Sequence, residues 1–131
     1  MSSEISVIAG LAYANDAQNI PSIQIPATFA AYNVDIVGTR FNAGVIDLTT
    51  STGGTAIPMG DLNSIGWATF TNLDSSGIIV LQSTSGATPS VKLLPTEQCV
   101  FRLAGSTAPF AYATTCITGL TPLLEYLMLE S

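Results

Sequence analysis

The chain has 131 residues and a formal net charge of −6, and 47% of its residues are apolar while only 9% are charged. This length predicts one domain with its own core, and nine acidic side chains against three basic ones (Arg40, Lys92 and Arg102) exclude a surface that follows nucleic-acid phosphates. No apolar run reaches the roughly 18 residues of a membrane span, and Met1-Ser2-Ser3-Glu4 lacks the basic start of a signal peptide, so we expect a protein that folds in the cytoplasm without membrane contact.

The first third of the chain shows short apolar alternations separated by polar or proline-containing turns. Glu4–Ala14 begins with Ile5 and Val7 on one face, so residues 1–10 form either a first strand or an extended N-terminal arm. A short strand is expected at Ser22–Ile25 between two prolines, which favours a sheet edge because proline cannot donate to a ladder. Another strand is expected within Tyr32–Val37.

Two turn signals follow, and each predicts a hairpin. Gly53-Gly54 is expected to close one between strands Val45–Thr50 and Thr55–Met59. The stretch Gly66–Leu81 is expected to form the central hairpin of the domain. In it Trp67, Thr69, Thr71 and Leu73 alternate with Ala68, Phe70 and Asn72, and the Asp74-Ser75-Ser76-Gly77 turn returns the chain into an apolar run.

The last third continues the pattern of short strands. A Pro95 turn is expected between the first and second of these segments, and the final segment is expected to be a strand rather than a helix because it is short. The expected strands are Val91–Leu94, Cys99–Leu103, Phe110–Thr115 and Leu124–Glu130.

Strand-like segments every 8–12 residues, with no convincing helix, are typical of sandwiches and barrels. The sequence therefore predicts an all-β fold: a single-domain antiparallel β-sandwich of jelly-roll-like type over residues 1–131, with about eight or more short strands. Aromatic side chains at period-2 spacing, among them Trp67, Phe70 and Tyr126, are expected in its core.

Residue chemistry indicates no catalytic, cofactor or metal site. The chain has no histidine, which removes the commonest general base and metal ligand. Lys92 is expected on a solvated strand face rather than as an activated amine, and Asp74 as a turn residue. Cys99 and Cys116 are expected to be buried reduced thiols, with a disulfide between them less favoured. We therefore expect a protein that is not an enzyme.

Four segments in the second half resemble small virion proteins of tailed bacteriophages. Such proteins carry an aromatic–Asn-Leu-Asp turn, a Leu-x-Pro-Gly-Glu turn before a Phe-Arg-Leu strand, and a Leu-Glu-Tyr terminal strand. Thr96 stands where that pattern usually has glycine. The matching segments are Gly66–Asp74, Val91–Leu103, Phe110–Ala113 and Leu124–Glu130.

The resemblance implies a non-enzymatic structural protein of the phage particle, assembled in the host cytoplasm and located in the virion. The preferred position is that of a capsid decoration or cement protein, which would stabilise the major capsid lattice by binding only the assembled shell. Its partners would be the major capsid protein or other virion subunits, and copies of itself in a trimer or dimer. A tail, collar or fibre-base protein is the first alternative, and a carbohydrate-binding β-sandwich module, tested by exposure of Trp67, is the second.

Contacts with partners are expected on segments that a rigid β scaffold leaves free to vary. Two loops rich in Ser, Thr and Gly fit this description, Thr49–Thr55 and Ser83–Ser90, together with the arm Ser2–Val7. Each of them can equally be an ordinary solvent loop. Few charges and many hydroxyl groups give a neutral polar surface, which suits a subunit that packs against other subunits.

Overall fold

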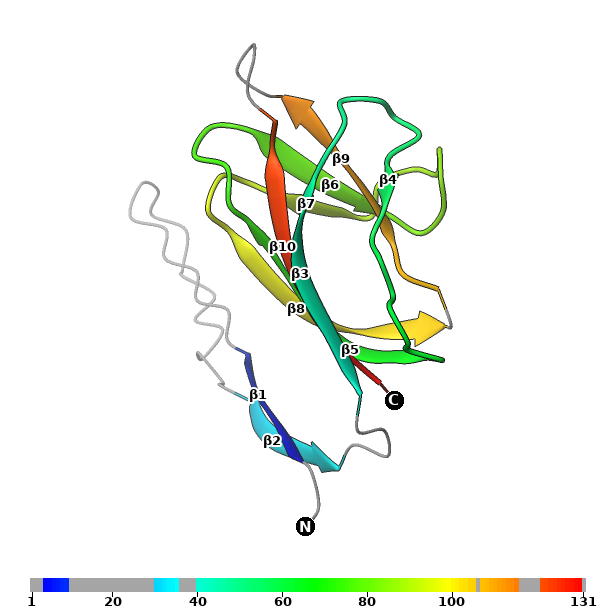
Figure 1. Cartoon of the computed structure of the whole chain (residues 1–131). Coiled ribbons are helices and arrows are strands. Elements are labelled where there is room, and N and C mark those ends of the chain that lie inside the picture. The colour runs from blue at the N-terminus through cyan, green and yellow to red at the C-terminus, as the bar shows by residue number, and fades with distance from the viewer. Residues whose placement is uncertain (1–3, 10–29, 36–39, 106, 116–120, 131) are drawn as a thin grey trace, which may run out of the picture. The chain divides into compact units, whose positions relative to one another are not determined.

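The computed structural model describes residues 4–9, 30–35, 40–105, 107–115 and 121–130. The chain divides into two compact units, Met1–Val37 and Gly38–Ser131. In the first unit β1 (Glu4–Ala9) pairs antiparallel with β2 (Ala30–Asp35), as Figure 1 shows. The expected sandwich lies within the second unit, and the segment 1–10 contributes a strand to the first. The strand expected at 22–25 lies outside the described residues.

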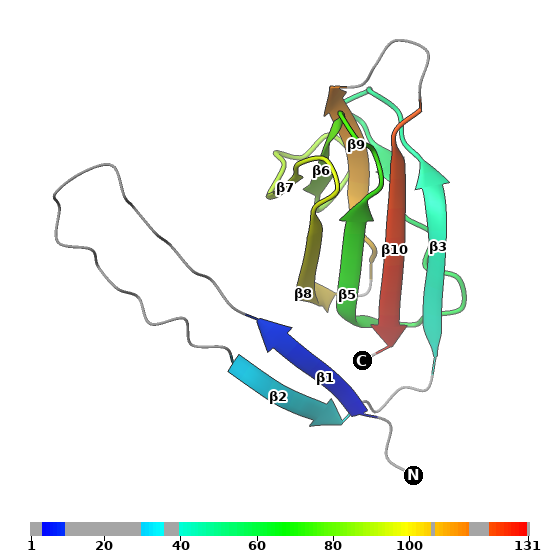
Figure 2. The same cartoon turned by 90° about the vertical axis from the view of Figure 1, so that its left-hand side faces the viewer.

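The second unit is a sandwich of two four-stranded antiparallel sheets (Figure 1). The sheet with the longer strands, here the long sheet, faces the viewer in Figure 2. Its strands in spatial order are β3 (Phe41–Asp47), β10 (Leu123–Glu130), β5 (Ile65–Asn72) and β8 (Gln98–Gly105). The other, the short sheet, contains β4 (Thr55–Ala56), β9 (Phe110–Thr115), β6 (Ile78–Gln82) and β7 (Val91–Leu93).

These strand orders define a jelly roll, so the predicted fold class is confirmed. Antiparallel pairs β3–β10, β4–β9, β5–β8 and β6–β7 form one continuous two-stranded ribbon. The ribbon folds over so that successive pairs fall in alternate sheets, and the pairs β10–β5 and β6–β9 then close the two sheets. Most strands thus have partners far away in the sequence, and this is the arrangement of eight-stranded jelly rolls.

Both predicted hairpins are wrong in one respect: the turns form, but the flanking strands lie in different sheets. β3 and β4 flank Gly53-Gly54 and belong to the long and short sheets, and β5 and β6 flank the Asp74 turn in the same way. Among the strands from β3 to β10, only β6 and β7 are both consecutive and paired. Turn residues determine where the chain reverses, whereas the apolar face of each strand determines that β5 and β6 face one another across the core.

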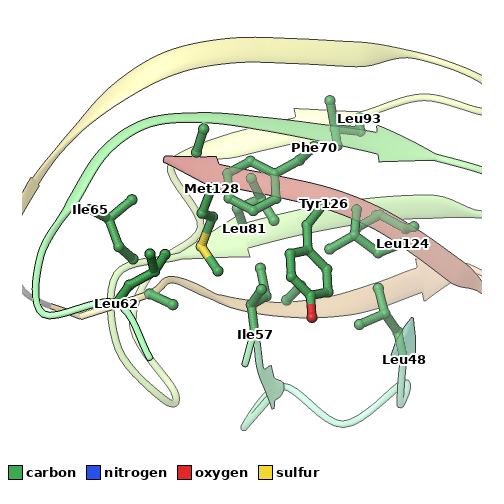
Figure 3. Close-up of a cluster of buried hydrophobic side chains, with 14 residues drawn as sticks. Leu48, Ile57, Leu62, Ile65, Phe70, Leu81, Leu93, Leu124, Tyr126 and Met128 are labelled. Atoms are coloured by element: carbon green, nitrogen blue, oxygen red, sulfur yellow. The ribbon is translucent and has the colours of Figure 1, made fainter. Parts of the chain in front are cut away.

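The core fills the space between the sheets (Figure 3). Phe70 and Met128 from the long sheet and Leu81 from the short sheet are each at most 1% exposed, and burial of each such side chain contributes about 1.5–3 kcal/mol. Tyr126 is buried as expected, and Phe101 packs against the cluster with its ring centre 5.6 Å from that of Phe70. Trp67, which was also expected in the core, instead lies half-buried on the opposite side of β5 from Phe70.

One buried amide holds the corner at which the ribbon passes from the long sheet to the short sheet. Asn72, the last residue of β5, is fully buried. Its Nδ2 donates to the carbonyl oxygens of Gly77 at 2.8 Å, Leu93 at 3.2 Å and Leu94 at 3.0 Å, and its Oδ1 accepts from the backbone N–H of Asp74 at 2.9 Å. The side chain therefore joins the β5–β6 connection to the β7–β8 connection beside it.

Asp74 completes the first of these connections, in the turn role predicted for it. Its Oδ1 accepts from the backbone N–H groups of Ser76 at 2.8 Å and Gly77 at 3.0 Å. Those bonds lower the pKa of the Asp74 carboxyl from its ordinary value, because they stabilise the ionised form. A Cβ on Gly77 would lie 2.7 Å from the carbonyl oxygen of Thr115, so this position needs glycine for close approach rather than for a positive φ.

The second connection is a tight turn from Leu94 to Glu97. The Glu97 N–H donates to the Leu94 carbonyl at 3.1 Å, Pro95 occupies the second position, and Thr96 adopts a φ of 65°. Proline followed by a residue of positive φ is the arrangement of a type II turn. Glycine adopts such a φ without strain, whereas Thr96 adopts it with strain. The glycine that the phage pattern has at this position would therefore fit the same backbone.

Replacement of Asn72 by alanine is expected to lower the free energy of unfolding by about 3 kcal/mol, since an unpaired buried acceptor costs about 1–3 kcal/mol and three carbonyls lose a donor. Urea denaturation followed by Trp67 fluorescence measures the change. Thr71→Ala, one residue earlier on the outer side of β5, is the matched control and is expected to shift stability by no more than about 0.5 kcal/mol. Equal losses in the two variants would contradict the role of the amide.

Asp74 is expected to make stability depend on pH. Because its pKa is lowered in the folded state, its contribution is present above the ordinary pKa of 3.8 and is lost as pH falls through the folded value. The amide introduced by Asp74→Asn would still accept the turn bonds but would not titrate. The stability advantage of the natural chain over this variant, measured by urea denaturation at a series of pH values, is therefore expected to be constant near neutrality and to shrink below about pH 4. A difference that does not change with pH would contradict this assignment.

Candidate interaction surfaces

Among the residues that the structure describes, no group of three or more His, Cys, Asp or Glu side chains gathers in a way that could hold a metal ion. Lys92 is exposed on β7, and the Asp74 carboxylate is engaged in its turn. No helix among the described residues is long and apolar enough to cross a membrane. Two surfaces of the second unit could contact another macromolecule.

The structure brings the two predicted contact loops together, and we name them the hydroxyl loop pair (Thr49–Thr55 and Ser83–Ser90). Ser85 Oγ of the second loop donates to the Gly53 carbonyl of the first at 2.9 Å. Gln82, fully buried at the end of β6, donates from Nε2 to the carbonyls of Thr52 and Gly53, each at 3.1 Å. The loops are thus one surface, although 32 residues separate Ser85 from Gly53.

Glycine is required at the centre of the first loop. Gly54 has a φ of 71°, and a Cβ there would lie 2.8 Å from Gln82 Nε2 and 3.2 Å from the Ala111 carbonyl oxygen. Its N–H donates to the Ser51 carbonyl at 2.9 Å, so the loop is closed on itself beneath its exposed hydroxyl side chains. The side chains that face solvent include Thr50, Ser51 and Thr52 in the first loop and Ser83, Thr84, Ser85 and Thr88 in the second.

The second surface is the outer face of the long sheet, where apolar residues lie in solvent. Burial alternates along its strands: Leu124, Tyr126 and Met128 of β10 are buried, while the residues between them point outward. The strand register aligns these outward residues in rows across the sheet. We define the apolar outer face by nine of them: Phe41, Ala43, Val45, Leu73, Trp67, Val100, Leu123, Leu127 and Leu129.

The exposure of this face is unusual for large apolar side chains. Phe41 is 69% exposed, Val45 52% and Val100 50%. A shallow depression of about 500 Å³ lies over the same face, between Val45, Thr69 and Leu127. Strand spacing of about 4.8 Å and a rise of about 3.4 Å per residue give the four strands roughly 450 Å² of sheet. The apolar residues cover part of this area, and the largest apolar patch of a monomeric protein, about 300–600 Å², is often an interaction site.

The sequence divided the residues of β5 between two faces, but Trp67 and Phe70 were both expected in the core, and this outer face was not identified. The alternation of Trp67, Thr69, Thr71 and Leu73 with Ala68, Phe70 and Asn72 was predicted correctly. On β8 the residues Cys99, Phe101 and Leu103 pack against the core. The signal that could have found the face is the apolar residues at both alternating sets of positions in the last segment, Leu123–Glu130. There Leu127 and Leu129 point outward while Leu124 and Met128 fill the core.

The predicted N-terminal arm and the two cysteines are the remaining predictions to compare with the structure. Residues 4–7 of the proposed arm belong to β1 and pair with β2 in the first unit. Cys99 is a free, half-buried thiol, and burial raises its pKa to about 11. Cys116 lies outside the described residues.

Comparison of the chain with protein-family models, with curated proteins and with solved structures found no match.

Replacement of Gln82 by methionine, which has a similar shape but no donor, is expected to loosen the hydroxyl loop pair. The Thr52 and Gly53 carbonyls would lose their shared donor, so the Gly54 amide is expected to exchange with deuterium about tenfold faster, through more frequent local opening. Hydrogen exchange read by mass spectrometry or NMR measures this. Gln98→Met, at an exposed position of β8, is the control. An unchanged Gly54 exchange rate in Gln82→Met would contradict the role of the Gln82 amide.

Proposed function

We propose that the chain is a non-enzymatic structural protein of a tailed-bacteriophage particle, and specifically a capsid decoration protein that stabilises the major capsid lattice. The observation that carries the proposal is the apolar outer face of the long sheet, on which Phe41, Val45 and Val100 are each at least half exposed. Contiguous apolar patches of this kind often mark interaction sites. A subunit of an assembly covers such a face with another subunit. The four segments that resemble phage virion proteins suggest that this assembly is a phage particle.

The fold supports the same assignment. Jelly rolls are common among viral capsid and lectin domains, and this one has two of the turns that carry the phage resemblance at the corner of its ribbon: Asn72–Asp74 in one connection and Pro95–Glu97 in the next. Fold alone does not define a function. The proposal therefore rests on the surfaces, with the fold as their rigid support.

The hydroxyl loop pair is the part of the surface that we assign to the shell. It is exposed, uncharged and held in shape by Gln82 and Ser85. Hydroxyl groups on a rigid loop can form many weak hydrogen bonds with a partner without the cost of removing charges from water. Repetition of such contacts over a lattice gives strong total binding, and a protein that binds only the assembled shell stabilises it by linkage.

A sugar-binding platform finds less support on this surface. Such platforms stack sugar rings on exposed aromatic side chains, and Trp67 was the residue whose exposure would indicate one. Trp67 is only half-exposed, and Phe41 is the one aromatic among the strongly exposed large apolar residues of the described part of the chain. The apolar outer face is otherwise aliphatic, which favours a protein partner.

Co-sedimentation of the purified chain with emptied shells of its own phage tests the proposal. The natural chain is expected to pellet with shells at a fixed stoichiometry and to raise their melting temperature. Thr52→Arg combined with Ser85→Arg is expected to weaken pelleting at least about tenfold, because two charges would lose water at the contact. Lys92→Glu, at an exposed position of β7 outside these loops, is the control.

Three results would contradict the proposal. The chain could ignore shells at every concentration, it could form rings that bind tail or fibre components, or it could bind a host glycan. The second result would assign the chain to the tail, collar or fibre base, and the third to a carbohydrate-binding module.

A further inference from the structure

We infer that the apolar outer face of the long sheet binds the same face of a second copy of this chain, in a two-fold dimer. This inference rests on the proposed function and makes it more specific, because it names the partner of the apolar outer face on which the proposed function is based. It leaves the hydroxyl loop pair free for the shell. Its basis is the way in which charged residues are distributed around the apolar residues.

The outward residues form four rows across β3, β10, β5 and β8. Strand register gives the second and third rows directly. In the first row Leu73, which follows β5, joins Leu123 by donating its N–H to the Leu123 carbonyl at 3.0 Å. The fourth row crosses a bulge beside Gly66, where the register between β5 and each of its neighbours shifts. From one end of the sheet to the other, the rows are Asp47, Leu123 and Leu73; Val45, Glu125, Thr71 and Gln98; Ala43, Leu127, Thr69 and Val100; Phe41, Leu129, Trp67 and Arg102.

Charges on this face occupy opposite corners. Asp47 and Glu125 lie at one corner, on the edge strand β3 and its neighbour β10, and Arg102 lies at the diagonally opposite corner on β8. All three side chains are exposed. Strand geometry separates Asp47 from Arg102 by roughly 14 Å across the sheet and 20 Å along it. The other diagonal runs from Phe41 to Leu73 and is mostly apolar.

This layout is self-complementary under one symmetry operation. A two-fold axis that lies between two such faces, along the diagonal from Phe41 to Leu73, exchanges the two charged corners. Arg102 of each copy then lies over Asp47 and Glu125 of the other, while the apolar residues near the axis pack on one another. Two-fold interfaces use the same patch on both subunits, and opposite charges at the margin of such a patch determine its orientation.

Other occupants fit the face less well. A polyanion would meet two carboxylates and one guanidinium. A membrane surface would require several basic residues around the apolar patch, and Arg102 is the one basic residue in the four rows. A second copy supplies both an apolar surface of equal size and the reversed order of charges.

Charge exchange between two full-length variants tests the dimer without disturbing the core. Arg102→Glu makes the charges of the face all acidic, and Asp47→Lys with Glu125→Lys makes them all basic. Each variant alone would oppose like charges, so its dimer is expected to be at least about tenfold weaker than that of the natural chain. An equimolar mixture is expected to restore dimers that contain one copy of each variant. Sedimentation velocity and native mass spectrometry measure both results.

An apolar variant and a control complete the experiment. Val45→Asp, at an exposed position in the second row, is expected to give a monomer with the circular dichroism of the natural chain. Lys92→Glu on the short sheet is expected to leave the dimer unchanged.

The inference is overturned if the natural chain is monomeric or trimeric at all concentrations, or if Arg102→Glu dimerises as strongly as the natural chain. It is also overturned if the mixture shows no preference for mixed dimers. Measurement of shell binding distinguishes a failure of the dimer inference from a failure of the proposed function. A monomeric natural chain that pellets with shells, and loses this with Val45→Asp, would assign the face to the shell. A dimer that behaves as expected but ignores shells would keep the dimer and reject the decoration role.

Discussion

The sandwich depends on how its ribbon of paired strands changes direction between sheets. Within a sheet, backbone N–H and C=O groups bond to neighbouring strands, but at a corner they leave the ladder while still inside the protein. Unpaired, each would cost about as much as a lost hydrogen bond. Asn72 supplies the missing partners for two adjacent connections at once, because one carboxamide can both donate to Gly77, Leu93 and Leu94 and accept from Asp74. The positions of β6 and β7 beneath the long sheet follow from this corner.

The two interaction surfaces result from the same geometry. The ribbon brings loops from distant parts of the sequence to one place, where the buried Gln82 holds the first loop and Ser85 joins the second to it. It also places β3, β10, β5 and β8 side by side, so that outward residues from four separate segments form one face. Neither surface exists in any single stretch of the chain. Both are products of long-range strand pairing.

The sequence predicted the local features well and the long-range pairing poorly. Asp74 as a turn residue, Pro95 in a turn, the two alternating faces of β5 and the terminal strand could all be inferred from periodicity and turn chemistry, which act over a few residues. Which face of β5 is the inner one could not be inferred, and Trp67 was wrongly expected in the core. The hairpins at Gly53-Gly54 and Asp74 were wrong because a tight reversal looks the same whether its strands pair within a sheet or face each other across a core. Phe41 and Val45 could not be assigned to a surface until β3 had a partner, since burial depends on what lies beside a strand.

Cys99 gives the fold a chemical property as well as a structural one. Oxidants and alkylating reagents attack the thiolate, and a thiol with a pKa of about 11 holds very little of it at neutral pH. Its side chain lies on the inner side of β8, half-covered by the core that it helps to fill. The side chain therefore contributes packing to the core, while its raised pKa keeps it mostly in the less reactive thiol form at neutral pH.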